Sequence, residues 1–187
     1  MVRQVCIRLI LLLLLLHGAN FAAEAAERDF APDQVKAVFL YNMTHFVTWP
    51  PNELGLSDRP FTFCVLGNRD IAAMLTIVLE GEKVVGRDPV VVSVAKNKAI
   101  PPCQLLFIDQ SISEQEQAEI LAQMQGHAVL VTGDREGFCE QGGGVFLGLQ
   151  KNKISLSINK AAIEQQQLQV SSRLLQVAKV VSSRVAP

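Results

Sequence analysis

Short apolar runs recur along the chain between polar segments that are rich in glycine and proline. We expect four of these runs to be strands: residues 61–66, 89–94, 105–108 and 128–132. Continuous apolar runs are typical of strands buried on both faces, as in a parallel sheet. Two further runs, residues 145–149 and 154–158, are joined by Lys151-Asn152 and predict a hairpin at the sheet edge.

Segments with helical periodicity alternate with these runs. Apolar residues at three- and four-residue spacing predict a helix at about residues 70–79. Ser113 as N-cap, with Glu116 in the capping-box position, predicts the start of another. Two more helical segments are expected at 161–167 and 172–181. The expected fold class is α/β: a single three-layer-like domain with a mixed sheet of about six strands flanked by helices.

The segment 34–49 also looks like one helix, but its apolar arc is wider than the stripe of an ordinary surface helix. One side gathers Val35, Phe39, Phe46 and Trp49. A second strip consists of Leu40, Met43 and Val47, with Tyr41 at its margin, and is a candidate interface. Burying such side chains is worth roughly 1.5–3 kcal/mol each. We therefore expect another surface to cover this strip, either within the domain or on a second chain.

The N-terminus has the pattern of a secretory signal peptide. Arg3 and Arg8 precede an apolar run, residues 9–16, that is well short of the ~20 residues needed to span a bilayer. Ala23-Glu24-Ala25 supplies a cleavage site. We expect residues 1–25 to be removed and residues 26–187 to form the mature domain.

The charge of the mature chain argues against two classes of partner. Removal of the signal peptide takes away Arg3, Arg8 and Glu24, which leaves 15 basic and 17 acidic residues and a net charge of −2. This balance offers no electrostatic footprint for nucleic acid or for anionic lipid.

Three cysteines remain after cleavage: Cys64, Cys103 and Cys139. Export places them where disulfides form. Cys64 and Cys103 both lie at expected strands, and adjacent strands would bring them together; the alternative is a pair of reduced core thiols. A closed loop of about 40 residues would stabilise the fold by roughly 3–4 kcal/mol. Cys139 is then unpaired or links two chains.

No residue pattern indicates catalysis, a metal site or a cofactor. The run Gly142-Gly143-Gly144 is followed by a strand rather than a helix, so a turn fits better than a phosphate loop. His45 and His127 belong to no closely spaced set of metal-ligand residues. The set Cys139, His127 and Asp134 matches no local signature of a thiol enzyme. We expect no catalytic residue, no metal ligand and no enzymatic activity.

Several segments together resemble the YfiR/HmsC-like family. They are residues 35–43 running into 46–50, then 63–67, 81–87, 103–108, 142–143, 157–162 and 171–175. Their joint order and spacing carry the resemblance, which covers nearly all of the mature chain.

The resemblance implies a periplasmic regulator that represses an inner-membrane diguanylate cyclase by binding the periplasmic sensor region of that enzyme. Repression would lower cyclic di-GMP and restrain biofilm formation. A second implied partner is an outer-membrane, peptidoglycan-binding lipoprotein that sequesters the regulator. The family is also similar in forming a mixed α/β domain that dimerises, with a disulfide between the counterparts of Cys64 and Cys103.

The chain departs from the family in the Gly-rich region. Some members carry a second disulfide there, and the position that would pair with Cys139 corresponds to Phe146. The family's redox behaviour is therefore not carried over to Cys139. An alternative function is that of a periplasmic small-molecule-binding sensor, with a pocket between the helices and the sheet edge.

Overall fold

The structure of the chain is a computed structural model that describes residues 31–54, 59–150 and 153–183. The expected signal peptide, residues 1–25, lies outside the described residues.

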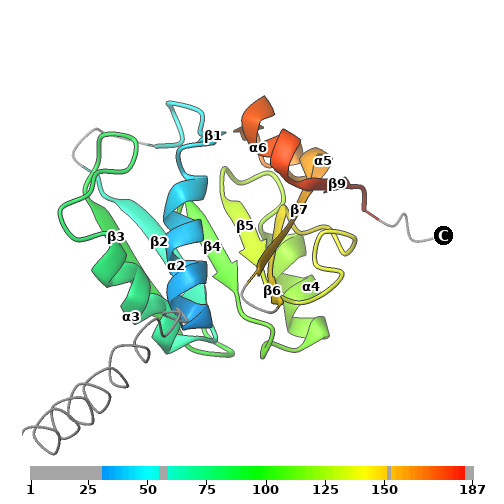
Figure 1. Cartoon of the computed structure of the whole chain (residues 1–187), viewed down its shortest axis with the longest axis horizontal. Helices are drawn as coiled ribbons and strands as arrows, with labels where there is room; N and C mark the ends of the chain where they lie inside the picture. Colours follow the sequence, from blue (N-terminus) through cyan, green and yellow to red (C-terminus); the bar gives the residue numbers. More distant parts are fainter. Residues whose placement is uncertain (1–30, 55–58, 151–152, 184–187) are drawn as a thin grey trace, which may run out of the picture.

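A seven-stranded sheet with the strand order β3-β2-β4-β5-β6-β7-β9 forms the centre of the molecule (Figure 1). Its strands are β2 (Phe61–Leu66), β3 (Pro89–Val94), β4 (Leu105–Ile108), β5 (Leu130–Gly133), β6 (Val145–Gln150), β7 (Lys153–Asn159) and β9 (Lys179–Val181). The strands from β3 to β6 run parallel, β7 is antiparallel to β6, and β9 is parallel to β7. The expected mixed sheet is confirmed, with one strand more than expected.

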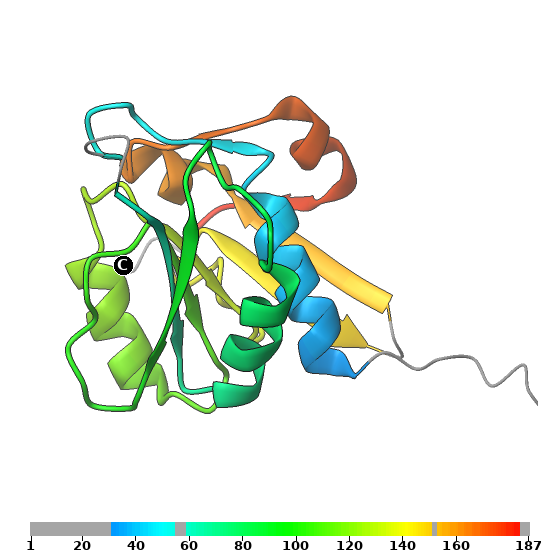
Figure 2. The same ribbon diagram turned by 90° about the vertical axis from the view of Figure 1, so that its left-hand side faces the viewer.

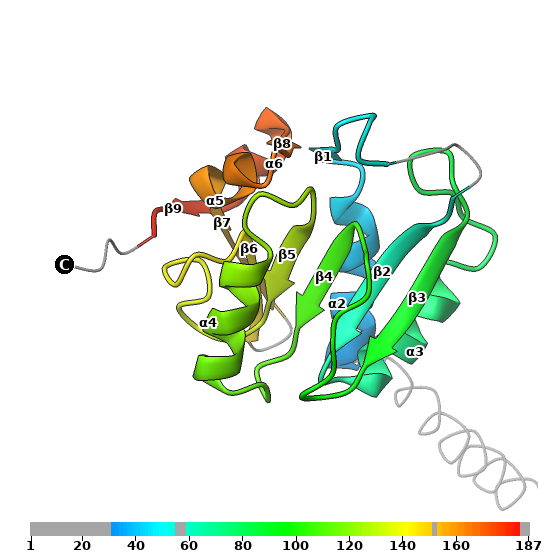
Figure 3. The same cartoon turned by 180° about the vertical axis from the view of Figure 1, so that it is seen from behind.

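Helices cover both faces of this sheet (Figures 2 and 3). On one face lie α2 (Pro32–Met43) and α3 (Arg69–Val78), and on the other lies α4 (Glu114–Gln123). The expected three-layer arrangement of helices around a sheet is thus confirmed.

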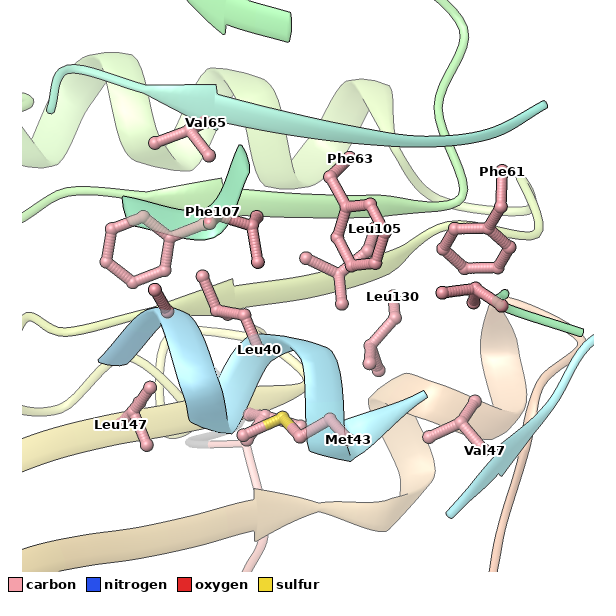
Figure 4. Close-up of a cluster of buried hydrophobic side chains, with 14 of the residues drawn as sticks. Leu40, Met43, Val47, Phe61, Phe63, Val65, Leu105, Phe107, Leu130 and Leu147 are labelled. Atoms are coloured by element: carbon pink, nitrogen blue, oxygen red, sulfur yellow. The ribbon is translucent and has the colours of Figure 1, made fainter. Parts of the chain in front are cut away.

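Strand β2 contributes to both of the apolar cores that these layers enclose. Phe61, Phe63 and Val65 pack with α2 and α3, and Figure 4 shows them on the side of the sheet that faces Leu40. Cys64 and Leu66 pack in the core beneath α4. Successive side chains of a strand point to opposite faces, so a strand covered on both sides reads as a continuous apolar run.

The C-terminal part adds two short helices and a small second sheet. The helices are α5 (Lys160–Gln165) and α6 (Ser172–Val177). Strand β1 (Val47–Thr48) pairs antiparallel with β8 (Gln169–Val170). These short elements close the end of the molecule where α2 stops (Figure 1).

Two expected helices are shorter in the structure. The helix expected at 34–49 ends at Met43, and the chain then turns into β1. Trp49 precedes a proline, which disfavours the helical conformation there. The helix expected at 172–181 ends at Val177, because the valine-rich segment after it forms β9 against β7. β-Branched residues favour strands where a sheet edge offers a partner.

The start of α4 follows the sequence prediction in one respect and departs from it in another. Ser113 caps the helix, since its hydroxyl accepts a hydrogen bond from the Glu116 amide at 3.2 Å. The Glu116 carboxylate does not complete a capping box. It accepts instead from the Asn97 amide at 3.0 Å, which ties α4 to the loop after β3.

The Gly-rich segment forms a turn before β6, as expected. Gly142 has a φ of +100°, which side chains disfavour. The Phe138 ring fills the space beside Gly133 and Gly143: a Cβ on Gly143 would lie 2.1 Å from this ring and one on Gly133 would lie 2.6 Å from it. These two glycines are therefore required by packing, and no phosphate is needed to explain them.

Candidate functional site

An apolar groove opens between α2, β7 and α6, and we call it the α2–α6 groove. Its cavity has a volume of about 540 Å³. It is lined by Phe39, Asn42, Met43, His45, Phe46, Leu156, Arg173, Leu174 and Val177. Apolar cavities of this size with a few polar groups are typical of binding sites.

The groove exists because one flank of α2 is covered and the other is not. On the covered flank, α2 packs against α3, and beyond it the Tyr41 hydroxyl donates to Glu82 Oε2 at 2.6 Å. On the open flank, Phe39 and Phe46 are half-buried. Across the groove, the Val177 side chain is 75% exposed. Apolar side chains from separate segments thus meet at the surface without being fully covered.

Arg173 gives the groove its charge. No aspartate or glutamate belongs to the groove lining, and Arg173 forms no salt bridge within the part of the chain that the structure describes. The described groove therefore combines apolar walls with an unpaired cation.

The strip of α2 that was expected to form an interface does not coincide with the α2–α6 groove. Leu40, Met43 and Val47 are 0%, 2% and 6% exposed within the single chain, so they belong to the core and not to a surface between chains. Figure 4 shows them directed at the sheet and at the C-terminal elements. Of the four residues proposed, Met43 alone lines the groove, and Tyr41 lies on the opposite flank of α2. The internal alternative is the one that the structure supports.

Sequence reasoning missed the residues on the far side of the groove. Leu156, Arg173 and Val177 are more than a hundred positions from α2. A partial signal was present in Val177, which follows Leu174 at a three-residue spacing on the expected C-terminal helix.

Sequence reasoning also missed a polar cluster at the carboxyl ends of β2, β4 and β5. Lys36 of α2 donates to Asp134 Oδ2 at 2.6 Å, and its side chain is 10% exposed. Asp134 Oδ1 accepts from the Gln110 amide at 2.6 Å. The neighbouring Asp109 accepts from Asn68 Nδ2 at 3.1 Å. This cluster holds the N-terminal half of α2 against the sheet.

The two carboxylates of this cluster have opposite pKa shifts. Burial raises the pKa of Asp134, and the nearby Asp109 charge adds to this, although the Lys36 ammonium opposes it. Burial also acts to raise the pKa of Asp109, but hydrogen bonds from Ser111 and Asn68, with the charge of Lys36, lower it overall. Lys36 thus favours the ionised form of both aspartates.

Cys64 and Cys103 lie side by side as free, buried thiols. The hydrogen bond between the two side chains lowers the pKa of Cys64 and, together with burial, raises that of Cys103. Cys103 also lines a cavity of about 300 Å³ with Met124 and His127. The structure brings the expected pair together without forming the bridge, so the disulfide stays a prediction.

Cys139 is a free thiol with no exposed surface. Burial raises its pKa to about 12, while a backbone hydrogen bond from Phe146 acts in the opposite direction. The backbone of Phe146 therefore lies beside the Cys139 sulfur, and the assignment of Phe146 to the position of a second cysteine stays a prediction. A thiol so buried fits an unpaired cysteine better than a link between chains.

The structure does not bring Cys139, His127 and Asp134 together as the catalytic set of a thiol enzyme. His127 precedes β5 and Asp134 follows it, so the two lie at opposite ends of this strand. Asp134 is paired with Lys36. Among the residues that the structure describes, no group of three or more histidine, cysteine, aspartate or glutamate residues is arranged to hold a metal ion. Within those same residues, no helix combines the length and apolarity of a membrane span.

Comparison with known proteins bears on the whole described domain. No curated protein matches the chain significantly. The model of one family, described as YfiR/HmsC-like, matches residues 33–179. This match includes α2 from its second residue, strands β2 to β7 and α6, and therefore all the residues that line the α2–α6 groove. The chain belongs to the YfiR/HmsC-like family.

Proposed function

We propose that the chain is a periplasmic regulator that represses an inner-membrane diguanylate cyclase by binding the periplasmic sensor region of that enzyme. Repression lowers cyclic di-GMP and restrains biofilm formation. The regulator acts through the conformation of its partner and has no turnover of its own. The proposal includes a homodimer and sequestration by an outer-membrane, peptidoglycan-binding lipoprotein.

Membership of the YfiR/HmsC-like family supports the regulatory role. The single structural observation that favours protein binding is the α2–α6 groove. It presents half-buried Phe39 and Phe46 beside exposed Val177. Aromatic residues and arginine are enriched where proteins bind one another, and clustered apolar surface of this kind marks interaction sites.

Deletion of the gene tests this function. We expect cyclic di-GMP to rise in the deletion strain and to return to its original level when the responsible membrane-anchored cyclase is deleted as well. Full-length protein supplied from a plasmid should restore repression. The matched control is residues 26–187 without the signal peptide, which should stay in the cytoplasm and fail to repress. Unchanged cyclic di-GMP in the deletion strain would contradict the proposal.

A small-molecule sensor is the alternative function, and the groove volume of about 540 Å³ favours it. Drug-sized ligands occupy cavities of roughly 300–1,000 Å³. The two functions differ in what co-purifies from the periplasm. A sensor would carry a small molecule that mass spectrometry detects after denaturation, with no loss of cyclase control when the gene is deleted.

A further inference from the structure

The sheet has an open edge directly beside the α2–α6 groove. Strand β9 pairs with Ser157–Asn159 of β7, whereas residues 153–156 of β7 pair within the described chain with β6 alone. Figure 2 shows β7 continuing beside α2, away from the body of the sheet. An unpaired strand edge is a template for an added strand.

The open edge and the groove share Leu156. This residue lies in the unpaired part of β7, and its side chain lines the groove with Phe39 and Phe46. Residues that face each other on neighbouring strands point to the same side of a sheet. A side chain paired opposite Leu156 would therefore enter the groove from the added strand.

The charge of the groove indicates which kind of partner would bind there. Arg173 has no carboxylate partner among the described residues, and the groove lining contains no acidic side chain. A second copy that packed this surface on itself by two-fold symmetry would bring the two Arg173 side chains toward each other. An acidic partner would instead neutralise Arg173, so charge complementarity favours a different chain.

We propose that the open edge of β7 and the α2–α6 groove bind an extended acidic segment of a partner protein. The segment pairs with residues 153–156 as an added strand, inserts alternate apolar side chains between Phe39 and Val177, and places a carboxylate on Arg173. This inference rests on the proposed function where it assigns the segment to the periplasmic region of the cyclase. The chemistry of the segment follows from the groove itself.

Two synthetic peptides test this chemistry on the mature protein, residues 26–187. The first is fluorescein-labelled Thr-Leu-Thr-Leu-Thr-Glu-Thr, and the second carries Lys in place of Glu. Fluorescence anisotropy should show at least tenfold tighter binding of the Glu peptide. Hydrogen exchange should slow at residues 153–156 when that peptide is bound.

Substitutions at two exposed residues of the groove should leave the fold intact and change only the groove surface. Arg173→Glu should reverse the preference between the two peptides, and Val177→Glu should weaken both by tenfold or more. The matched controls are Lys98→Glu and Ile77→Glu, which are exposed positions outside the groove lining and should stay within twofold of the original protein. Equal binding of both peptides, or a preference that survives Arg173→Glu, would overturn the inference. So would a dimer that Val177→Glu converts to a monomer without any peptide binding, because a second copy would then occupy the groove.

Repression by the same variants separates this inference from the proposed function. If gene deletion raises cyclic di-GMP but Arg173→Glu and Val177→Glu still repress fully, the groove is not the docking site and the proposed function stands. If the peptides bind as expected but deletion leaves cyclic di-GMP unchanged, the proposed function is wrong and the peptide chemistry of the groove stands. Loss of repression in both groove variants, with normal controls, supports the two together.

Discussion

At the residue scale, Lys36 is a charged residue buried within the fold. It lies on the buried face of α2 between apolar neighbours, and its side-chain partner Asp134 is 98 positions away. A charge taken out of water is costly unless it is paired. The Lys36–Asp134 pair is therefore required for α2 to pack against the sheet.

Replacement of the lysine tests this dependence. Lys36→Met should lower the free energy of unfolding by about 3 kcal/mol at pH 7, because it leaves Asp134 buried and unpaired. Without Lys36 the pKa of both aspartates rises. A carboxyl whose folded-state pKa is raised destabilises the folded protein as pH rises and the group ionises. The difference in the free energy of unfolding between Lys36→Met and the original protein should therefore be smaller near pH 4 than at pH 7.

Urea unfolding at both pH values measures the effect, with the exposed Lys98→Met as control. A Lys36→Met protein as stable as the original at pH 7 would show that the pair contributes nothing to the fold.

The contact between Cys64 and Cys103 leads to a second prediction at this scale. In protein purified from the periplasm, we expect the two to be bridged, with Cys139 left as a free thiol. Cys64→Ala with Cys103→Ala should lower the free energy of unfolding by roughly 3–4 kcal/mol, because the closed loop is about 40 residues long. Mass spectrometry of peptides digested without reduction checks the pairing. Recovery of Cys64 and Cys103 as separately alkylated peptides would contradict it.

At the element scale, the sequence patterns predicted the interior of the fold better than its ends. The continuous apolar runs at 61–66, 105–108 and 128–132 identified central strands, because burial on both faces leaves no polar alternation. The turn into β1 and the strand β9 were missed. Each depends on a distant pairing partner, β8 or β7, and local periodicity carries no information on such partners.

Helix α2 illustrates the same limit. Its wide apolar arc indicated that apolar surface extends beyond one face of the helix, but not which of these residues remain outside the core. Leu40 and Met43 lie in the core, while Phe39 and Phe46 border the groove. The choice is made by β7 and α6, which reach α2 from the other end of the chain.

A substitution at Leu40 tests the burial of α2. Leu40→Asp should unfold the domain rather than release a folded monomer, because Leu40 is fully buried and an unpaired charge there is costly. Thermal melting and size-exclusion chromatography distinguish the two results. The control is Val38→Asp on the same helix, where the side chain is 37% exposed and the fold should persist. A folded Leu40→Asp protein with altered association would restore the interface interpretation.

At the scale of the whole molecule, the candidate site is assembled from segments far apart in the sequence. Phe39 of α2, Leu156 of β7 and Arg173 of α6 meet because the β6–β7 hairpin and the C-terminal elements fold back over the open flank of α2. The family resemblance predicted a binding function, but no local motif marks the groove. Among the described residues, its combination of an apolar cavity, an open strand edge and an unpaired cation is a property of the tertiary structure.

The most direct measurement is a reconstituted binding and inhibition assay with the detergent-solubilised, full-length membrane cyclase identified by the gene-deletion experiment. We predict that the mature chain co-purifies with this enzyme and slows its synthesis of cyclic di-GMP. A cyclase that lacks its periplasmic region should neither bind nor respond. Failure of the mature chain to bind the full-length enzyme, or equal inhibition of the truncated enzyme, would contradict the account.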